Sequence, residues 1–202
     1  MAEKNDHESP PSEARTFSFV LFGTLFLGLI AVGASFLTGT PLTQQLRLNP
    51  NDFLIGIIAT LPLVVFLWWF SNTTLEHLVS FRRSQIKFFA EIGFTFTPTR
   101  IALMAIGAGI SEELLFRGVF QSWLAGFTPV ILAIVLSNIL FGLLHMRTVL
   151  YAIIAGLVGA YLGALFAVTD NLLAPMVTHA LYDAAALEYT RRAVKNWRTH
   201  SI

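Results

Sequence analysis

The sequence has no cysteine among its 202 residues, and only 12% of its residues are charged. The lack of cysteine excludes disulfide bonds, thiolate metal ligands and a cysteine nucleophile. The shortage of charge excludes an ordinary soluble domain, in which about a quarter of the residues are charged. Hydrophobic residues make up 55% of the chain, and its mean hydropathy is +0.68. These values predict an all-α, polytopic membrane protein with the lipid bilayer as its partner and no nucleic-acid partner.

Apolar runs separated by polar, turn-rich segments predict a helix bundle with about six transmembrane helices. The acidic residues 1–16 predict a disordered cytoplasmic tail, and the basic residues 191–202 predict a C-terminal tail. Residues 17–96 hold two transmembrane helices and then a basic amphipathic segment, which we expect to lie as a helix on the cytoplasmic membrane face. The predicted spans cover residues 17–37, 53–70, 99–124, 129–145 and 149–168, and a sixth begins after Asn171 and ends at about Tyr189.

The first apolar run, Phe17 to Leu37, has a second interpretation as a signal peptide. Val32-Gly33-Ala34 resembles a small-residue cleavage site. The acidic residues in front of the run, and its length, favour a membrane span. We therefore expect this segment to form the first helix of the bundle.

The positions of the basic residues predict the orientation of the six spans. If the N-terminus is cytoplasmic, the 13 Lys and Arg residues, except Arg47 and Arg117, fall in the tails or in segments on the cytoplasmic side. Arg47 is in an outside loop, and Arg117 is inside a predicted span. The positive-inside rule therefore predicts that both termini are cytoplasmic.

Three ionisable residues interrupt the apolar run between Ile101 and Phe127, namely Glu112, Glu113 and Arg117. A charged side chain at that depth costs about 2.5 to 3.5 kcal/mol on insertion scales, so it usually marks a functional site. Glu113 and Arg117 are four residues apart, in the order that favours an ion pair on one helix face. Glu112 lies about 100° around the helix, and we expect it to face a wet cavity as a base. The alternative is that all three residues form one structural cluster.

Two later spans carry histidine in pairs with the same spacing. His145 follows Phe141 by four residues and His179 precedes Asp183 by four, so the members of each pair share a helix face. A carboxylate one turn away can fix the tautomer and orientation of an imidazole ring, which favours a functional role for His179. His145, near the cytoplasmic end of its span, has an equally good interpretation as a packing or interfacial residue.

Together these motifs resemble the motif set of the CPBP family of intramembrane proteases. They occur in the family's order, on separate apolar helices, as Glu112-Glu113-x-x-x-Arg117, Phe141-x-x-x-His145 and His179-x-x-x-Asp183. This family includes the type II CAAX prenyl endopeptidases and the bacteriocin-processing or self-immunity proteins, also called Abi proteins. The resemblance covers residues 97–190, which it implies to be the catalytic helix bundle, and it implies an integral protein of a bacterial plasma membrane.

The resemblance implies hydrolysis of a peptide bond within or at the membrane. In the family's terms, Glu112 and His145 activate a water molecule. His179 and the residue at position 183 stabilise the oxyanion, and the supporting residues are Glu113, Arg117 and Phe141. Where the family has Asn at this position the chain has Asp183, and an ionised carboxylate only accepts hydrogen bonds. We therefore predict that Asp183 orients His179.

No cofactor follows directly from the motifs. Glu112, His145 and His179 offer the oxygen and nitrogen ligands that a zinc ion accepts, with water in an open position. The sequence has no H-E-x-x-H motif, which would place two zinc ligands on one helix face. We favour water activation without a metal and keep zinc as the alternative.

A single site requires the motif residues to lie at a similar depth in the bundle. Counted at about 1.5 Å per residue from the outer ends of the spans, Glu112 is about 19 Å deep and His145 about 24 Å. On the same count Asp183 is about 16 Å deep and His179 only about 10 Å. Straight, upright helices would keep the two histidines apart, so we expect tilt or a bend to bring them together.

Two other classes of function remain open. A non-catalytic membrane scaffold or bacteriocin-immunity protein would keep the fold without needing Glu112. A proton-coupled transporter would also use intramembrane Glu, His and Asp, but it needs polar residues across the whole bilayer, and three of the spans offer almost none. The protease interpretation leaves open whether the substrate is a prenylated peptide, a leader peptide or another membrane protein, and it leaves the oligomeric state open.

Overall fold

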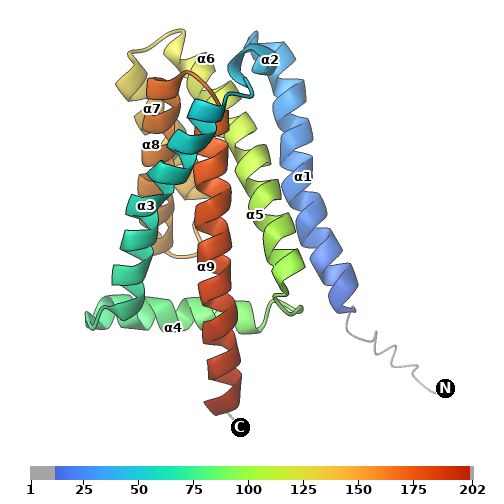
Figure 1. The fold of residues 1–202 in the computed structure, drawn as a ribbon, viewed down its shortest axis with the longest axis vertical. Helices are drawn as coiled ribbons and strands as arrows, with labels where there is room; N and C mark the ends of the chain where they lie inside the picture. Colours follow the sequence, from blue (N-terminus) through green and yellow to red (C-terminus); the bar gives the residue numbers. More distant parts are fainter. Residues whose placement is uncertain (1–11, 201–202) are drawn as a thin grey trace, which may run out of the picture.

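The computed structural model describes residues 12–200, which contain helices and no strand (Figure 1). The predicted all-α class is therefore confirmed. In chain order, the elements are α1 (Glu13–Thr38), α2 (Leu42–Gln45), α3 (Pro50–Asn72), α4 (Glu76–Ala90), α5 (Pro98–Glu113), the π-helix η1 (Leu114–Gln121), α6 (Ser122–Ala125), α7 (Val130–Leu144), α8 (Val149–Thr169) and α9 (Leu173–His200).

The long helices stand side by side as a bundle (Figure 1). α1, α3 and α8 are long and apolar enough to cross a membrane by length and composition, and α7 is a shorter apolar helix of 15 residues. α5, η1 and α6 follow one another without a break, and both this continuous segment and α9 carry charged motif residues that make them less apolar. The fold is the helical membrane bundle that the composition predicts.

Two of the spans begin where the sequence supplies a capping threonine. Thr97 Oγ1 accepts a hydrogen bond from Arg100 N at 3.2 Å at the start of α5. Thr148 Oγ1 accepts one from Tyr151 N at 3.1 Å at the start of α8. Such an oxygen satisfies a backbone N–H that has no partner inside the helix, which fixes the helix start.

The first helix begins inside the segment predicted to be a disordered tail. Ser12 Oγ accepts a hydrogen bond from Arg15 N at 3.3 Å, and α1 starts at Glu13. Glu13 in turn accepts a hydrogen bond from Arg100 Nη1 at 3.0 Å, which ties this end of α1 to α5. The prediction was therefore wrong for residues 13–16, and its remaining part, residues 1–11, lies outside the described residues.

The last helix also extends beyond its predicted span. α9 continues through the basic segment to His200. Glu188 Oε2 lies 2.7 Å from Arg191 Nε and Glu188 Oε1 lies 2.7 Å from Arg192 Nε, and ion pairs at these spacings support a helix that is exposed to water. Of the predicted C-terminal tail, residues 201–202 lie outside the described residues.

α4 crosses one end of the bundle, where the beginning of α1 and the end of α9 also lie (Figure 1). Arg82 Nη1 of α4 donates to Phe70 O of α3 at 2.8 Å. The guanidinium of Arg147, in the loop between α7 and α8, lies over the ring of Phe88 at 3.8 Å from its centroid. α4 is thus the expected amphipathic helix at the end of the bundle, and it contacts α3 and the loop between α7 and α8.

The start of α9 is covered by other parts of the protein. Asn171 and Leu172, which precede it, and Ala174 in its first turn are 0% exposed. A β-carbon on Gly109 of α5 would be 2.9 Å from Ala180 N, so glycine is needed for α5 to approach α9 this closely. This contact brings the middle of α9 next to the end of α5.

Candidate active site

The helix that carries the two glutamates changes from α- to π-helical directly after them, at Leu114. π-helical turns inside α-helices are rare and are frequent at functional sites. The π-helix η1 contains Arg117 and ends at Gln121, and both of these side chains are buried in the bundle. The change from α- to π-helix therefore lies between the two glutamates and Arg117.

Glu113 and Arg117 form the predicted ion pair, and both side chains are 0% exposed. Arg117 Nη1 donates to Glu113 Oε1 at 2.8 Å. Its Nη2 donates to Asn138 Oδ1 at 3.0 Å and to Gly159 O at 2.6 Å, which joins η1 to α7 and α8. A buried charge is stable only where partners replace its water shell, and these contacts supply such partners.

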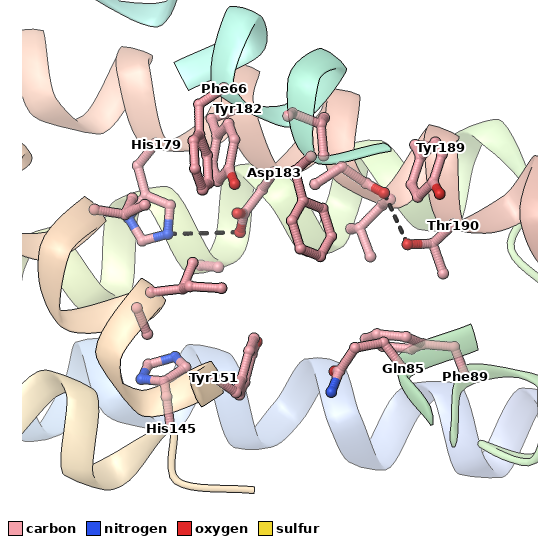
Figure 2. A pocket seen from close by; sticks show the side chains of 18 of the residues that line it. Phe66, Gln85, Phe89, His145, Tyr151, His179, Tyr182, Asp183, Tyr189 and Thr190 are labelled. Atoms are coloured by element: carbon pink, nitrogen blue, oxygen red, sulfur yellow. Dashed lines mark hydrogen bonds and ion pairs between the residues drawn. The ribbon is translucent and has the colours of Figure 1, made fainter. Parts of the chain in front are cut away.

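His179 lies among three carboxylates. Its Nδ1 is 2.7 Å from Glu113 Oε1, and its Nε2 is 3.5 Å from Asp183 Oδ2 and 3.9 Å from Glu112 Oε2. Figure 2 shows the contact with Asp183. The shortest of these contacts is the one with Glu113. Glu113 therefore contacts both the imidazole ring of His179 and the guanidinium of Arg117. In the geometry, Glu113 shares the orienting role that the sequence predicted for Asp183 alone.

His145 is held by the end of its own helix. It follows the last residue of α7, and its Nδ1 lies 2.8 Å from the carbonyl oxygen of Phe141. Because a carbonyl oxygen only accepts hydrogen bonds, Nδ1 carries the proton and Nε2 of the neutral ring is an acceptor. The ring also packs on Phe141, with ring centroids 4.3 Å apart. The predicted Phe141–His145 pair is therefore in contact, and this contact fixes the histidine's position and tautomer.

Glu112 and the two histidines converge on one point. Glu112 Oε2 is 3.8 Å from His145 Nε2 and 3.9 Å from His179 Nε2, and the Glu112 side chain is 14% exposed. These distances are too long for direct hydrogen bonds and suit a water molecule between the groups. The residues of the three motifs therefore meet, although counting from the helix ends separated the histidines. The assumption of straight, upright helices that all start at the same height therefore does not hold for this bundle.

A cavity of about 370 Å³ is lined by all four residues that the sequence predicted to be catalytic. Glu112 is one of them, and His145, His179 and Asp183 are shown in Figure 2 together with Tyr151, which also lines the cavity. A cavity of this size is in the range of ligand-binding sites. It continues towards α4, where its lining includes Phe66, Phe70, Phe81, Gln85, Phe89, Tyr189 and Thr190.

The predicted zinc ligands do not form a metal site as they are placed. Within residues 12–199, whose side chains are described, no group of three or more His, Asp or Glu is arranged to hold a metal ion. Three ligands at about 2.0–2.2 Å from a shared zinc ion would lie about 3.4 Å from one another. The Glu112 oxygen is 3.8 and 3.9 Å from the two histidine nitrogens.

Three residues of the site were missed from the sequence. Asn138 accepts a hydrogen bond from Arg117, and an amide in the mostly apolar α7 is the same kind of signal that singled out Glu112. Gly159 contributes its backbone carbonyl, which side-chain patterns do not reveal. Tyr151 lines the cavity beside His145, but tyrosine near the end of a span is common and gives little signal.

The fold and the site define a helical membrane protein in which Glu and His side chains surround an internal cavity. Residues 94–185 match the family model described as "Type II CAAX prenyl endopeptidase Rce1-like". The matched segment is just under half of the chain and contains all three motifs. The match confirms the resemblance to the CPBP family of intramembrane proteases. Comparisons with curated proteins and with solved structures gave no match.

Proposed function

We propose that this protein is an intramembrane endopeptidase that hydrolyses a peptide bond of a membrane-associated substrate of the prenylated type. The family match over residues 94–185 supports the class of reaction. The observation that carries the proposal is the position of Glu112 Oε2, 3.8 Å from His145 Nε2 and 3.9 Å from His179 Nε2, at the wall of the cavity.

Glu112 and His145 activate the water molecule in this proposal. Water between Glu112 Oε2 and His145 Nε2 can donate one hydrogen bond to each, because both atoms are acceptors. Its oxygen lone pair is then directed at the substrate carbonyl, and Glu112 takes the proton as the new C–O bond forms. The bundle around the site limits the access of bulk water to the reacting groups.

The proposed steps balance in atoms, electrons and protons. The water oxygen bonds to the carbonyl carbon, the carbonyl π electrons move to oxygen as an oxyanion, and Glu112 gains one proton. The oxyanion then re-forms the carbonyl, the C–N bond breaks, and the proton on Glu112 passes to the leaving amine. His179 stabilises the oxyanion as an imidazolium, with Glu113 and Asp183 balancing its charge.

The far part of the cavity supports a substrate with an apolar, lipid-like group. Phe66 and Phe70 of α3 and Phe81 and Phe89 of α4 line the path between the catalytic residues and the end of the bundle. A substrate peptide anchored by a prenyl group in the membrane leaflet next to α4 would reach Glu112 along this path. A prenylated C-terminal peptide is therefore the first substrate class to test.

We further propose that both termini are cytoplasmic, in the plasma membrane of a bacterium. α4, which carries Arg82, Arg83 and Lys87, lies at the same end of the bundle as the basic end of α9 (Figure 1). The positive-inside rule assigns that end to the cytoplasm. Reporter fusions to each terminus that are active only in the cytoplasm are expected to be active at both ends.

The function is tested with purified protein in liposomes and quenched peptides that carry or lack an S-farnesyl cysteine. Wild type is expected to cleave the farnesylated peptide, with and without EDTA, and Glu112→Gln is expected to lose cleavage while unfolding at the same temperature. Equal cleavage by both proteins would remove Glu112 from the mechanism. Loss of activity in EDTA that zinc restores would replace this mechanism by a metal-dependent one. A wild type that cleaves none of the peptides would favour the scaffold or immunity function.

A further inference from the structure

The oxyanion needs a hydrogen-bond donor, and the groups around it are mostly acceptors. Glu113 Oε1 lies 2.7 Å from His179 Nδ1, so the proton of a neutral His179 ring is on Nδ1 and Nε2 faces the cavity without one. His145 has the same tautomer because Phe141 O accepts from its Nδ1. His179 thus donates to the oxyanion only as an imidazolium. A second donor, one that carries its proton whether or not His179 is protonated, would serve the oxyanion in either state of the histidine.

Tyr151 has a hydroxyl group of this kind at the cavity wall. The residue lies in the first turn of α8 and lines the cavity with Glu112, His145 and His179. Figure 2 shows its ring beside His145. Among the residues that the structure describes, none forms a hydrogen bond with the Tyr151 hydroxyl, and the backbone N–H of Tyr151 donates to Thr148 Oγ1. The hydroxyl oxygen is also not among the buried polar atoms that lack a partner, so it is accessible, and the residue lines the cavity.

Three contacts hold the Tyr151 ring in place. The ring meets His145 edge-on with centroids 6.3 Å apart, and its centroid is 6.4 Å from that of Phe81 in α4. The guanidinium carbon of Arg147 lies 5.5 Å from the Tyr151 centroid. A ring fixed on several sides keeps its hydroxyl in position without a hydrogen bond of its own. A group that is oriented in advance and still free to donate is what oxyanion stabilisation requires.

The other tyrosine of α8 has the opposite arrangement. Tyr161 Oη donates to Ala59 O of α3 at 2.8 Å, and Tyr161 does not line the cavity. Tyr182 and Tyr189 do line the cavity, but it is Tyr151 whose ring contacts a histidine of the site. Tyr161 therefore joins two helices, whereas the Tyr151 hydroxyl is left for a bound molecule.

We propose that the Tyr151 hydroxyl donates a hydrogen bond to the oxyanion that forms on the substrate carbonyl, a catalytic role that rests on the proposed function. The hydroxyl keeps its proton throughout. Its hydrogen bond strengthens as the carbonyl oxygen gains negative charge and weakens when the C–N bond breaks and the carbonyl re-forms. The group that it recognises is the carbonyl of the scissile peptide bond.

The two tyrosines of α8 provide a matched test with the farnesylated quenched peptide. Tyr151→Phe removes one oxygen and keeps the ring contacts, so kcat is expected to fall about 100-fold with little change in KM or in unfolding temperature. Tyr161→Phe is expected to show the reverse, with an unchanged kcat and a lower unfolding temperature. An unchanged kcat in Tyr151→Phe overturns the proposal.

Asp183→Asn separates the donor role from a structural one. An Asn side chain can donate from its amide, which a carboxylate cannot do, so it offers a second donor at the site. In this background Tyr151→Phe is expected to cost only about 10-fold in kcat. The same loss in both backgrounds would contradict the donor role.

The outcome for Glu112 distinguishes the two proposals. If wild type and Tyr151→Phe cleave at the same rate while Glu112→Gln is inactive, the role of Tyr151 is wrong and the proposed function stands. If wild type cleaves no peptide, the proposed function fails, and the role of Tyr151 fails with it.

Discussion

Glu112 and Glu113 are neighbours in the chain with opposite surroundings. Glu113 is 0% exposed and lies 2.8 Å from Arg117 Nη1 and 2.7 Å from His179 Nδ1. Glu112 is 14% exposed, lines the cavity, and lies 3.8 and 3.9 Å from the two histidine Nε2 atoms. A carboxylate with two short partners is fixed in one arrangement, whereas one held near two imidazoles keeps an oxygen free for water. In this bundle the distance from each carboxylate to its partners, rather than the residue type, separates the structural glutamate from the one that we propose to be the base.

The largest expected effect is on catalysis, at Glu112. Glu112→Gln keeps the shape of the side chain and removes the proton acceptor, so kcat is expected to fall about 10³-fold. The free energy of unfolding is expected to stay the same, because Glu112 has no short contact to lose. Peptide cleavage and unfolding in SDS micelles measure the two quantities. If Glu112→Gln is both inactive and poorly folded, the distinction between Glu112 and Glu113 is wrong.

The same change one residue later is expected to act on stability. Glu113→Gln leaves the buried charge of Arg117 without its counter-ion, which is expected to lower the free energy of unfolding by about 3–5 kcal/mol. Glu188→Gln is the control, since Glu188 pairs with Arg191 and Arg192 on an exposed part of α9, and it is expected to cost less than about 1 kcal/mol. The account is wrong if Glu113→Gln is as stable as the control.

A smaller effect is expected at Asn138, the second side-chain partner of Arg117. Asn138→Leu removes the acceptor at 3.0 Å from Nη2 and leaves Gly159 O in place, so a loss of about 1–3 kcal/mol is expected. Its neighbour provides the control, because Ser137 Oγ donates to Phe116 O at 3.1 Å and involves no charge. Unfolding experiments should show a larger loss for Asn138→Leu than for Ser137→Ala, and the reverse order would contradict the bracing role of Asn138.

The smallest effect is expected at Asp183. Glu113 already holds His179 at Nδ1, and Asp183 is 3.5 Å from Nε2, so Asp183→Asn is expected to change kcat/KM by only a few fold. Initial rates over a range of peptide concentrations measure this. A loss of about 100-fold or more would show that His179 depends on the carboxylate of Asp183 rather than on Glu113.

The sequence predicted contacts within one helix better than contacts between helices. The Glu113–Arg117 pair followed from spacing, because the α-helical period places residues four apart on one face. The contact between Glu113 and His179 joins α5 to α9, and it depends on the close approach of those helices at Gly109. No local pattern encodes such an approach, so Glu113 was predicted to brace Arg117 and not to hold a histidine.

The depth of His179 was misjudged for a related reason. The count assumed that the last span starts at the membrane surface. Asn171 instead lies fully buried before α9, with its Nδ2 donating to Asp52 Oδ2 of α3 at 2.7 Å. This contact links residues far apart in the chain, and together with the contacts between Asn171 and Arg47 it covers the start of α9. The approximate positions of the helices along the chain could therefore be predicted, while their relative heights in the bundle could not.

The most direct test of the account measures cleavage and folding together for wild type, Glu112→Gln and Glu113→Gln in the same liposomes. Initial rates on the farnesylated peptide are divided by the folded fraction of each protein. Glu112→Gln is expected to be fully folded and inactive, and Glu113→Gln is expected to be less folded but more active per folded molecule than Glu112→Gln. Wild-type activity per folded molecule in Glu112→Gln would contradict this expectation.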